Sequence, residues 1–221
     1  MFFSVALIHS SVDVVPLLTE VSKNVIADVE LIHMVDEGMQ SIVDAAGEVT
    51  EPITRRLCAY VMNAHEAGAE AAVLTSPALG TTIDAVQASV SIPVMRIDEA
   101  AVETAVRLGN SVGVLSANQL TLDATASFIR DRADAAGRDV VVETRHCDDA
   151  EHALKNGDQE AHDYIATSAV DRLAGNDIIL LADVLMERIV HAAGERVDVP
   201  VIASPRLGFE GLAKKLNYFR R

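Results

Sequence analysis

An internal repeat constrains this chain more than any other feature. Three strand-like apolar segments recur in the same order at a shift of 107 residues. Positions 4–5 recur as 111–112, positions 68–76 as 175–183, and positions 93–94 as 200–201. Short apolar matches arise by chance, but three in one register do not. The repeat predicts two copies of one α/β unit and makes Ser76 and Asp183 equivalent positions.

Predicted strands and helices alternate along both halves. Strands are expected at residues 2–8, 29–35, 71–74, 92–97, 112–115, 139–143, 177–181 and 199–203. Helices are expected at residues 13–23, 50–66, 81–88, 99–108, 120–136, 184–193 and 207–217, with one more ending at Gly175 and a loop or short helix at 148–158. This alternation is typical of parallel sheets joined by right-handed crossovers.

The predicted fold class is therefore α/β, with two pseudo-symmetric domains that are each a parallel sheet flanked by helices. The first domain is expected at residues 1–97 plus 205–221, and the second at 98–204. In open α/β sheets, ligands bind beyond the carboxyl ends of the strands. If the halves pack face to face, Ser76 and Asp183 would flank one cleft between the domains.

Composition narrows the class of partner. The net charge of −15 argues against nucleic acid and anionic membranes, since both require a basic footprint. The longest uncharged stretches are shorter than the roughly 20 residues that span a bilayer. Cys58 and Cys147 show no metal or disulfide spacing, and no secretory signal precedes the first strand. A reduced, cytoplasmic location is therefore expected.

Small polar residues follow the predicted strands. They are Ser10, Ser11, Thr75, Ser76, Ser116, Asn118 and, further along, Thr121. The apolar residues Pro77 and Val184 directly follow Ser76 and Asp183 and are counted with the site. No Lys or Arg lies among them. Hydroxyl and backbone N–H groups can hold a carboxylate by several hydrogen bonds at once, and a charged acceptor strengthens these bonds. Each residue alone is better explained as a helix cap. The set in both halves favours a shared anion-binding site for a small carboxylate.

The ordered motifs resemble one enzyme family. They are LIHSS, HMVDEGM, AVLTSPALG and PVMRIDEAAVETAV in the first half, and VGVLSANQLTL, IILLADVLM and VPVIASPRL in the second. The chain resembles the aspartate/glutamate/hydantoin racemase superfamily, which also contains arylmalonate decarboxylase and maleate isomerase. The resemblance implies two pseudo-symmetric domains with the active site between them and no cofactor.

The resemblance also implies a pair of catalytic cysteines, one after the third strand of each half. Here Ser76 and Asp183 stand at those positions. A thiol can be tuned to act as a base, whereas an alcohol is too weakly acidic unless another base takes its proton. A carboxyl group can accept a proton, and burial raises its pKa. The pair cannot work as two symmetric thiols.

Three interpretations follow. In the first, Asp183 is a single acid/base, Ser76 and Thr75 bind the substrate carboxylate, and one proton moves at the alpha carbon in racemisation, isomerisation or protonation after decarboxylation. In the second, the site binds a small acid without chemistry. In the third, Asp183 is only a helix N-cap and the catalytic group lies elsewhere.

Other polar residues are weaker candidates. The run His146-Cys147-Asp148-Asp149 contains ligand-type residues, but adjacent residues rarely converge on one metal, so no metal is expected. His9 and His33 lie at strand ends, where a structural hydrogen bond is the commoner role. Arg206 would be a carboxylate partner if it turned inward. A homo-oligomer is compatible with the sequence and is not specified by it.

Overall fold

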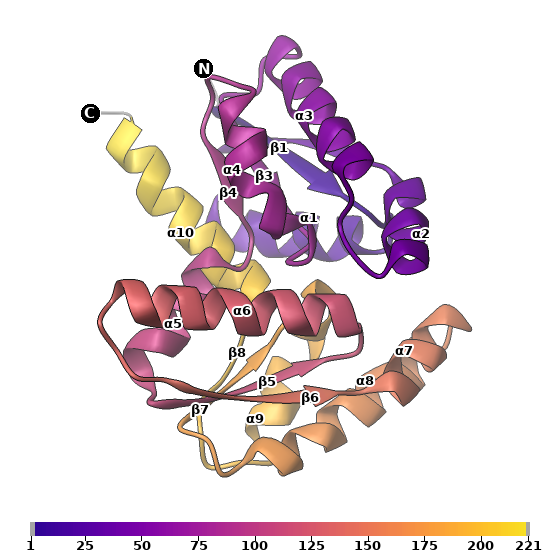
Figure 1. Cartoon of the computed structure of the whole chain (residues 1–221), viewed down its shortest axis with the longest axis vertical. Coiled ribbons are helices and arrows are strands. Elements are labelled where there is room, and N and C mark those ends of the chain that lie inside the picture. Colours follow the sequence, from indigo (N-terminus) through magenta and orange to yellow (C-terminus); the bar gives the residue numbers. More distant parts are fainter. Residues whose placement is uncertain (1–2, 220–221) are drawn as a thin grey trace. The chain divides into compact units, whose positions relative to one another are not determined.

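A computed structural model describes residues 3–219, which form two compact units (Figure 1). Within these residues, the first unit comprises residues 3–97 and 208–219, and the second comprises residues 98–207. Phe2, the predicted start of the first strand, lies outside the described residues. Among the described helices, none is both long enough and apolar enough to cross a bilayer.

The first unit is built on a four-stranded parallel sheet in the order β2-β1-β3-β4. Its strands are β1 (Phe3–His9), β2 (Val29–Val35), β3 (Ala71–Leu74) and β4 (Val94–Arg96). Its helices are α1 (Val14–Val25), α2 (Glu37–Ala46), α3 (Glu51–Glu66), the 3-10 helix η1 (Leu79–Thr82), α4 (Ile83–Ala88) and the part of α10 (Ser204–Phe219) from Gly208 onward.

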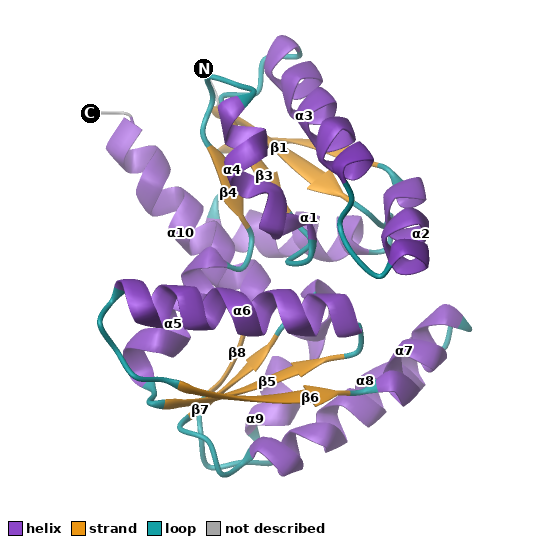
Figure 2. Ribbon diagram, viewed as in Figure 1, coloured by secondary structure: helices purple, strands orange, loops and turns teal. Residues whose placement is uncertain are grey.

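The second unit repeats this plan with the order β6-β5-β7-β8 (Figure 2). Its strands are β5 (Ser111–Ser116), β6 (Val141–His146), β7 (Ile178–Leu181) and β8 (Val201–Ala203). Its helices are α5 (Glu99–Leu108), α6 (Gln119–Ala135), α7 (Asp148–Lys155), α8 (Gln159–Ala169), η2 (Val170–Leu173), η3 (Val184–Ile189) and α9 (Val190–Gly194).

Strand register repeats at the shift seen in the sequence. Val5 pairs with Ala71 in the first sheet, and Val112 pairs with Ile178 in the second. Ala72 pairs with Val94, and Ile179 pairs with Val201. Each of these positions in the second sheet is 107 residues after its counterpart in the first. The two units therefore share one α/β fold, and the β1–β3 and β3–β4 pairings recur residue by residue in β5–β7 and β7–β8.

Both faces of the second sheet are covered, as parallel sheets require. Successive side chains of a strand point to opposite faces. Val112, Val114, Ile178 and Leu180 accordingly pack with α5 and α6, while Leu115, Ile179 and Leu181 pack on the opposite face with α8, η3 and α9. Figure 1 shows these helix layers above and below the sheet. The continuous apolar runs of β5 and β7 follow from this double burial.

Several boundaries differ from those expected. Helix α2 was not predicted, and Met39 and Val43, one turn apart, are its buried contacts. Strands β4 and β8 are three residues long rather than five or six. Residues 148–155 form a helix, within the predicted alternatives. The predicted helix at residues 184–193 is 3-10 over its first six residues and α-helical from Val190.

Candidate functional site at the carboxyl ends of the strands

In the first unit, the ends of β1 and β3 lie side by side. The Thr75 hydroxyl donates to the Ile8 carbonyl oxygen at 2.9 Å, and His9 Nδ1 lies 2.9 Å from the same hydroxyl. Because a carbonyl oxygen only accepts, Thr75 must use its one proton there and accept from His9 Nδ1–H. Both residues are buried. The Thr75 hydroxyl thus joins neighbouring strands and orients His9.

His9 continues this chain of hydrogen bonds to β2. Its Nε2 atom lies 2.9 Å from His33 Nδ1, and the two rings stack with centroids 5.2 Å apart. With Nδ1 protonated toward Thr75, neutral His9 accepts from His33 through Nε2. Burial and the neighbouring His33 lower the pKa of His9 to about 4, and burial lowers the pKa of His33. Both imidazoles are structural donors and acceptors at neutral pH.

The serines after β1 and β3 differ in whether their hydroxyl groups have hydrogen-bond partners. Ser10 donates to Gln40 Oε1 at 3.1 Å. Ser11 closes a local turn, accepting from the Asp13 amide and donating to the Asp13 carboxylate. Ser76 is half-buried between buried Thr75 and Pro77, and within residues 3–219 no protein group hydrogen-bonds its hydroxyl. Of these hydroxyls, that of Ser76 is the one available to a ligand.

Arg96, the last residue of β4, is a buried cation beside this loop that was not among the predicted site residues. Its side chain is 7% exposed, and Nη2 donates to the Pro77 carbonyl oxygen at 3.4 Å. A Cβ atom added to Gly80 would lie 2.6 Å from Arg96 Nε and 2.7 Å from Cζ. The loop that carries Ser76 therefore lies directly on a guanidinium group. The sequence signal that could have identified Arg96 as a site residue is its position at the carboxyl end of a predicted strand.

This close approach makes Gly80 a sensitive position. We expect Gly80→Ala to lower the free energy of unfolding by about 1–3 kcal/mol, because the added methyl group must displace a buried guanidinium group. Urea denaturation followed by circular dichroism measures this. Gly194→Ala is the matched control, since a Cβ there meets nothing within 4 Å. Equal stability of the two variants would show that Arg96 moves aside freely.

In the second unit, the carboxyl group of Asp183 lies at the end of β7 and bonds back to the end of β5. Oδ2 accepts from the Ala117 amide at 2.6 Å, and Oδ1 lies 2.9 Å from Ser116 Oγ. Asp183 precedes η3, but its side chain makes no capping hydrogen bond to that helix. The contacts therefore disagree with the interpretation of Asp183 as an N-cap.

The hydrogen bonds of Ser116 bear on the protonation of Asp183. Ser116 Oγ accepts from the Asn118 amide and also lies 2.8 Å from the Asn118 carbonyl oxygen. When Asp183 is ionised, the single hydroxyl proton must choose between that carbonyl and Asp183 Oδ1. When Asp183 is protonated at Oδ1, Asp183 donates to Ser116 and Ser116 donates to the carbonyl, so every contact is satisfied. The geometry favours the neutral carboxyl group.

Burial acts in the same direction on Asp183. It raises the pKa of the carboxyl group, and nearby Glu151 adds to the rise. The Ala117 amide, the Ser116 hydroxyl and the charge of His162 oppose the rise without cancelling it. A carboxyl group with a raised pKa can both give and take a proton closer to neutral pH.

The remaining predicted residues of this unit frame Asp183. Asn118 caps α6, with Oδ1 accepting from the Thr121 amide at 3.0 Å and Nδ2 donating to Glu151 at 3.2 Å. Thr121 and Val184 are buried. The structure thus brings Ser116, Asn118 and Asp183 together at one strand edge. The prediction that Ser76 and Asp183 flank one cleft stays a prediction.

The other polar candidates have structural partners. His146 Nε2 donates to the Ala117 carbonyl oxygen at 2.9 Å, and burial raises the pKa of the Cys147 thiol. In the part of the chain that the structure describes, no three His, Cys, Asp or Glu residues gather as metal ligands would. Arg206 is exposed, and its amide lies 3.5 Å from a Glu187 carboxylate oxygen.

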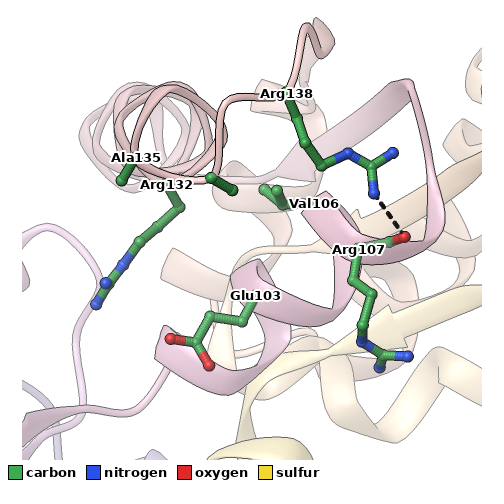
Figure 3. A pocket seen from close by; sticks show the side chains of 7 residues that line it. Glu103, Val106, Arg107, Arg132, Ala135 and Arg138 are labelled. Carbon is green, nitrogen blue, oxygen red and sulfur yellow. Dashed lines mark hydrogen bonds between the residues drawn. The ribbon is translucent and has the colours of Figure 1, made fainter.

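A pocket of about 410 Å³ lies elsewhere in the second unit, between the carboxyl-terminal parts of α5 and α6 (Figure 3). Arg138 donates there to the carbonyl oxygens of Arg107 and Gly109, just before β5 begins. The charged side chains at its rim point in different directions rather than converging (Figure 3). Because Arg138 bonds to the segment just before β5, the pocket lies at the amino-terminal edge of the sheet, away from the edge where open α/β sheets bind ligands.

The duplicated sheet, with polar groups at the carboxyl ends of its strands, defines a protein of two α/β units, each built on a four-stranded parallel sheet. The chain belongs to the Asp/Glu/hydantoin racemase family, whose model matches residues 7–211. A comparison with curated protein sequences finds no match.

Solved racemase structures share this fold. An aspartate racemase of Picrophilus torridus superposes with a TM-score of 0.77 at 13% identity, covering 97% of this chain and 94% of that one. The glutamate racemase isoform RacE1 of Bacillus anthracis gives 0.72 at 15% identity, covering 98% and 82%. An allantoin racemase of Klebsiella pneumoniae gives 0.68 at 15% identity, covering 98% and 89%. The TM-scores show a common fold.

Proposed function

We propose that this protein transfers a proton at the carbon alpha to the carboxylate of a small acid, without a cofactor, and that Asp183 carries the proton. The family supplies the reaction class, since its members include racemases of amino acids. Ser76 and Asp183 take the places of the two family cysteines in this proposal. The small acid is an amino acid or a related carboxylic acid.

One observation carries the proposal. The Asp183 carboxyl group stands at the carboxyl end of β7, and its hydrogen bonds and its raised pKa both favour a proton on it. A general acid/base works best when its pKa lies near the working pH. An ordinary surface carboxyl group, ionised throughout the neutral range, would be a poor proton donor.

The proposed step balances as a proton transfer. The ionised Asp183 takes the alpha proton, the electrons of the Cα–H bond move into the substrate as an enolate, and the protonated carboxyl group then returns a proton to carbon. The half-buried Ser76 hydroxyl donates to the substrate carboxylate, and donors to a charged acceptor form the stronger bonds. Ser76 serves as a binding group because a hydroxyl without a neighbouring base is not itself a base.

Hydrogen–deuterium exchange tests this function. The protein is incubated in deuterated water with a panel of small acids that includes both enantiomers of aspartate and glutamate. We expect loss of the alpha-proton NMR signal of at least one acid at a rate above the protein-free control. No exchange for any acid that binds, measured by calorimetry on the same panel, contradicts the catalytic proposal.

Stereochemistry separates the reactions of the family. A single proton-transfer group reaches one face of the substrate, so we expect one enantiomer to exchange with retention faster than it racemises. Chiral chromatography of the exchanged acid measures the ratio. Racemisation as fast as exchange would require a second acid/base on the opposite face. Exchange of a decarboxylation product alone would favour protonation after loss of carbon dioxide.

A non-catalytic binder is the second candidate. It is favoured by the surroundings of Ser76, where no basic side chain within the described residues hydrogen-bonds the hydroxyl. Such a protein would bind the acid and leave its alpha proton in place. The exchange panel, read together with calorimetry, distinguishes the two functions directly.

A further inference from the structure

Strand β6 is an open edge of the second sheet. It stands first in the order β6-β5-β7-β8, and among the described residues it pairs with β5 alone. Four of its six side chains are exposed, and that of the apolar Val141 is 65% exposed. An edge strand presents unpaired backbone groups to which another strand can add. This edge is therefore a place where a further strand can bind.

The backbone of β6 alternates between β5 and the free edge. The Val141 amide donates to the Asn110 carbonyl oxygen at 2.8 Å, and the Cys147 amide donates to the Ser116 carbonyl oxygen at 2.9 Å. The odd-numbered residues therefore direct their N–H and C=O groups toward β5. Because these groups alternate along a strand, the even-numbered residues direct theirs to the free edge. The outward-facing residues are Val142, Thr144 and His146.

The other sheet edges offer less. Strands β4 and β8 are three residues long. Strand β2, the remaining edge strand, exposes two of its seven side chains, whereas β6 exposes four of six. Proteins protect edges with proline, with bulges or with very short strands. Strand β6 contains no proline and pairs with β5 one residue to one, without a bulge. It is the least protected edge of the two described sheets.

Two opposite charges lie on one face of β6. Glu143 and Arg145 are both exposed, and they share a face because alternate side chains of a strand point the same way. Glu143 Oε2 accepts from Asn176 Nδ2 at 2.8 Å, which leaves Oε1 for a second donor. Arg145 makes no hydrogen bond or ion pair within residues 3–219. Both charges can therefore pair with groups outside this chain.

A second copy of β6 matches this edge in one antiparallel register. With a twofold axis at Thr144, the two copies of Thr144 exchange both backbone hydrogen bonds, and Glu143 of each copy lies opposite Arg145 of the other. Opposite charges at such facing positions, with Cα atoms about 4.5 Å apart, stabilise a sheet. An axis at Glu143 or at Arg145 would place like charges opposite each other. An axis at Val142 or at His146 would leave part of the strand unpaired.

We propose that this protein forms a homodimer by antiparallel pairing of two β6 strands, which joins two four-stranded sheets into one continuous sheet. The occupant of the edge is a second copy because the charges of β6 are complementary to themselves about Thr144. A twofold axis is also the commonest symmetry of soluble oligomers. This inference does not depend on the proposed function.

Sedimentation equilibrium of the intact protein tests the dimer. Physiological salt screens the repulsion between two chains that each carry a net charge of −15. We expect a monomer–dimer equilibrium in the wild type. Thr144→Pro removes the outward amide at the axis and no bond to β5, so the dissociation constant should rise at least about tenfold. Val35→Pro is the matched control on β2, where the next amide, that of Asp36, donates to His9 of β1 and the Val35 amide faces outward.

Two charge variants test the register. Glu143→Arg and Arg145→Glu each place like charges opposite one another twice in the dimer, so either variant alone should raise the dissociation constant at least about tenfold. In an equimolar mixture of the two variants, every facing pair again joins an arginine and a glutamate, and dimers should return. An axis at Glu143 or at Arg145 would instead leave one of the two variants as dimeric as the wild type.

Amide hydrogen exchange followed by NMR needs no substitution. The Thr144 amide should become protected as the protein concentration rises, whereas the Cys147 amide, which is bonded to β5, should be protected at every concentration. A protein that is still monomeric at about 1 mM overturns the inference and leaves the edge to an extended segment of another protein. A dimer that Thr144→Pro and both charge variants leave intact, each folded by circular dichroism, also overturns it, because that dimer uses another surface.

Discussion

Asp183→Asn is expected to reduce alpha-proton exchange at least about a hundredfold, because general acid/base groups contribute factors of this size and an amide cannot take the proton. The variant should fold normally. The asparagine amide can donate to Ser116 Oγ where the protonated carboxyl group does, and its carbonyl oxygen can accept from the Ala117 amide. Initial exchange rates at saturating acid, with folding checked by circular dichroism, measure the effect.

Asp183→Asn should increase the free energy of unfolding although it lowers the rate of exchange. The folded-state pKa of Asp183 is raised above the ordinary value of 3.8. The stability linked to this carboxyl group is therefore fully present below pH 3.8 and is lost as the pH rises through the raised pKa. The loss is roughly 1.4 kcal/mol for each pH unit that separates the folded-state pKa from the unfolded-state pKa. Asp183→Asn has no charge to bury, so it should gain stability relative to wild type as the pH rises above 3.8.

Ser76→Ala is the companion variant. It removes a hydroxyl that makes no hydrogen bond within residues 3–219, so stability should hardly change. Because Ser76 is proposed to bind the substrate carboxylate, affinity for the acid should fall by about tenfold, the worth of one hydrogen bond to a charged group, while exchange persists at saturation. Loss of exchange in Ser76→Ala with retention in Asp183→Asn would reverse the proposed roles.

Strand β7 could be predicted because the apolar residues 178–181 are buried on both faces of the sheet. The limits of β2 match the predicted residues 29–35 although the side chains of this edge strand are at most partly buried, and the repeat carries one half onto the other. Helix α2 was not predicted because Gly38 near its start is typical of a turn, and Met39 and Val43 are the buried residues among those whose burial is described along it. Local composition outweighed a weak helical pattern.

The partners of the candidate site residues were harder to predict. The bond between Ser116 and Asp183 joins residues 67 apart, and it exists because β5 pairs with β7, two strands further along the chain. Arg96 was missed because it lies within β4 rather than in the loop after it.

The histidine pair of the first unit makes the stability of the protein depend on pH. The pKa of His9 is lowered from 6.5 to about 4 by burial and by His33. Protonating His9 would place a proton on Nε2, so the bond between the rings would persist only with the proton of His33 moved from Nδ1 to Nε2. The folded protein resists this protonation, whereas the unfolded chain takes up the proton near pH 6.5.

The sign of the effect follows from proton binding. Between pH 6.5 and about 4 the unfolded state holds more protons at His9, so stability is fully present above pH 6.5 and is lost as the pH falls. The two pKa values imply a loss of about 2 kcal/mol between pH 7.5 and pH 5. Asp183 contributes with the opposite sign, because its stability is lost as the pH rises.

We therefore expect urea denaturation at pH 7.5 and pH 5, carried out in the Asp183→Asn background, to show a decrease of about 2 kcal/mol that His9→Gln removes. His9→Gln should be less stable at pH 7.5, because the bonds to Thr75 and His33 are weakened, and it should keep only the part of the decrease that comes from the lowered pKa of His33. His191→Gln is the control, since His191 is exposed. If His9→Gln keeps the full decrease, or if the His9 ring titrates near 6.5 by proton NMR, the buried pair is not the source of acid sensitivity.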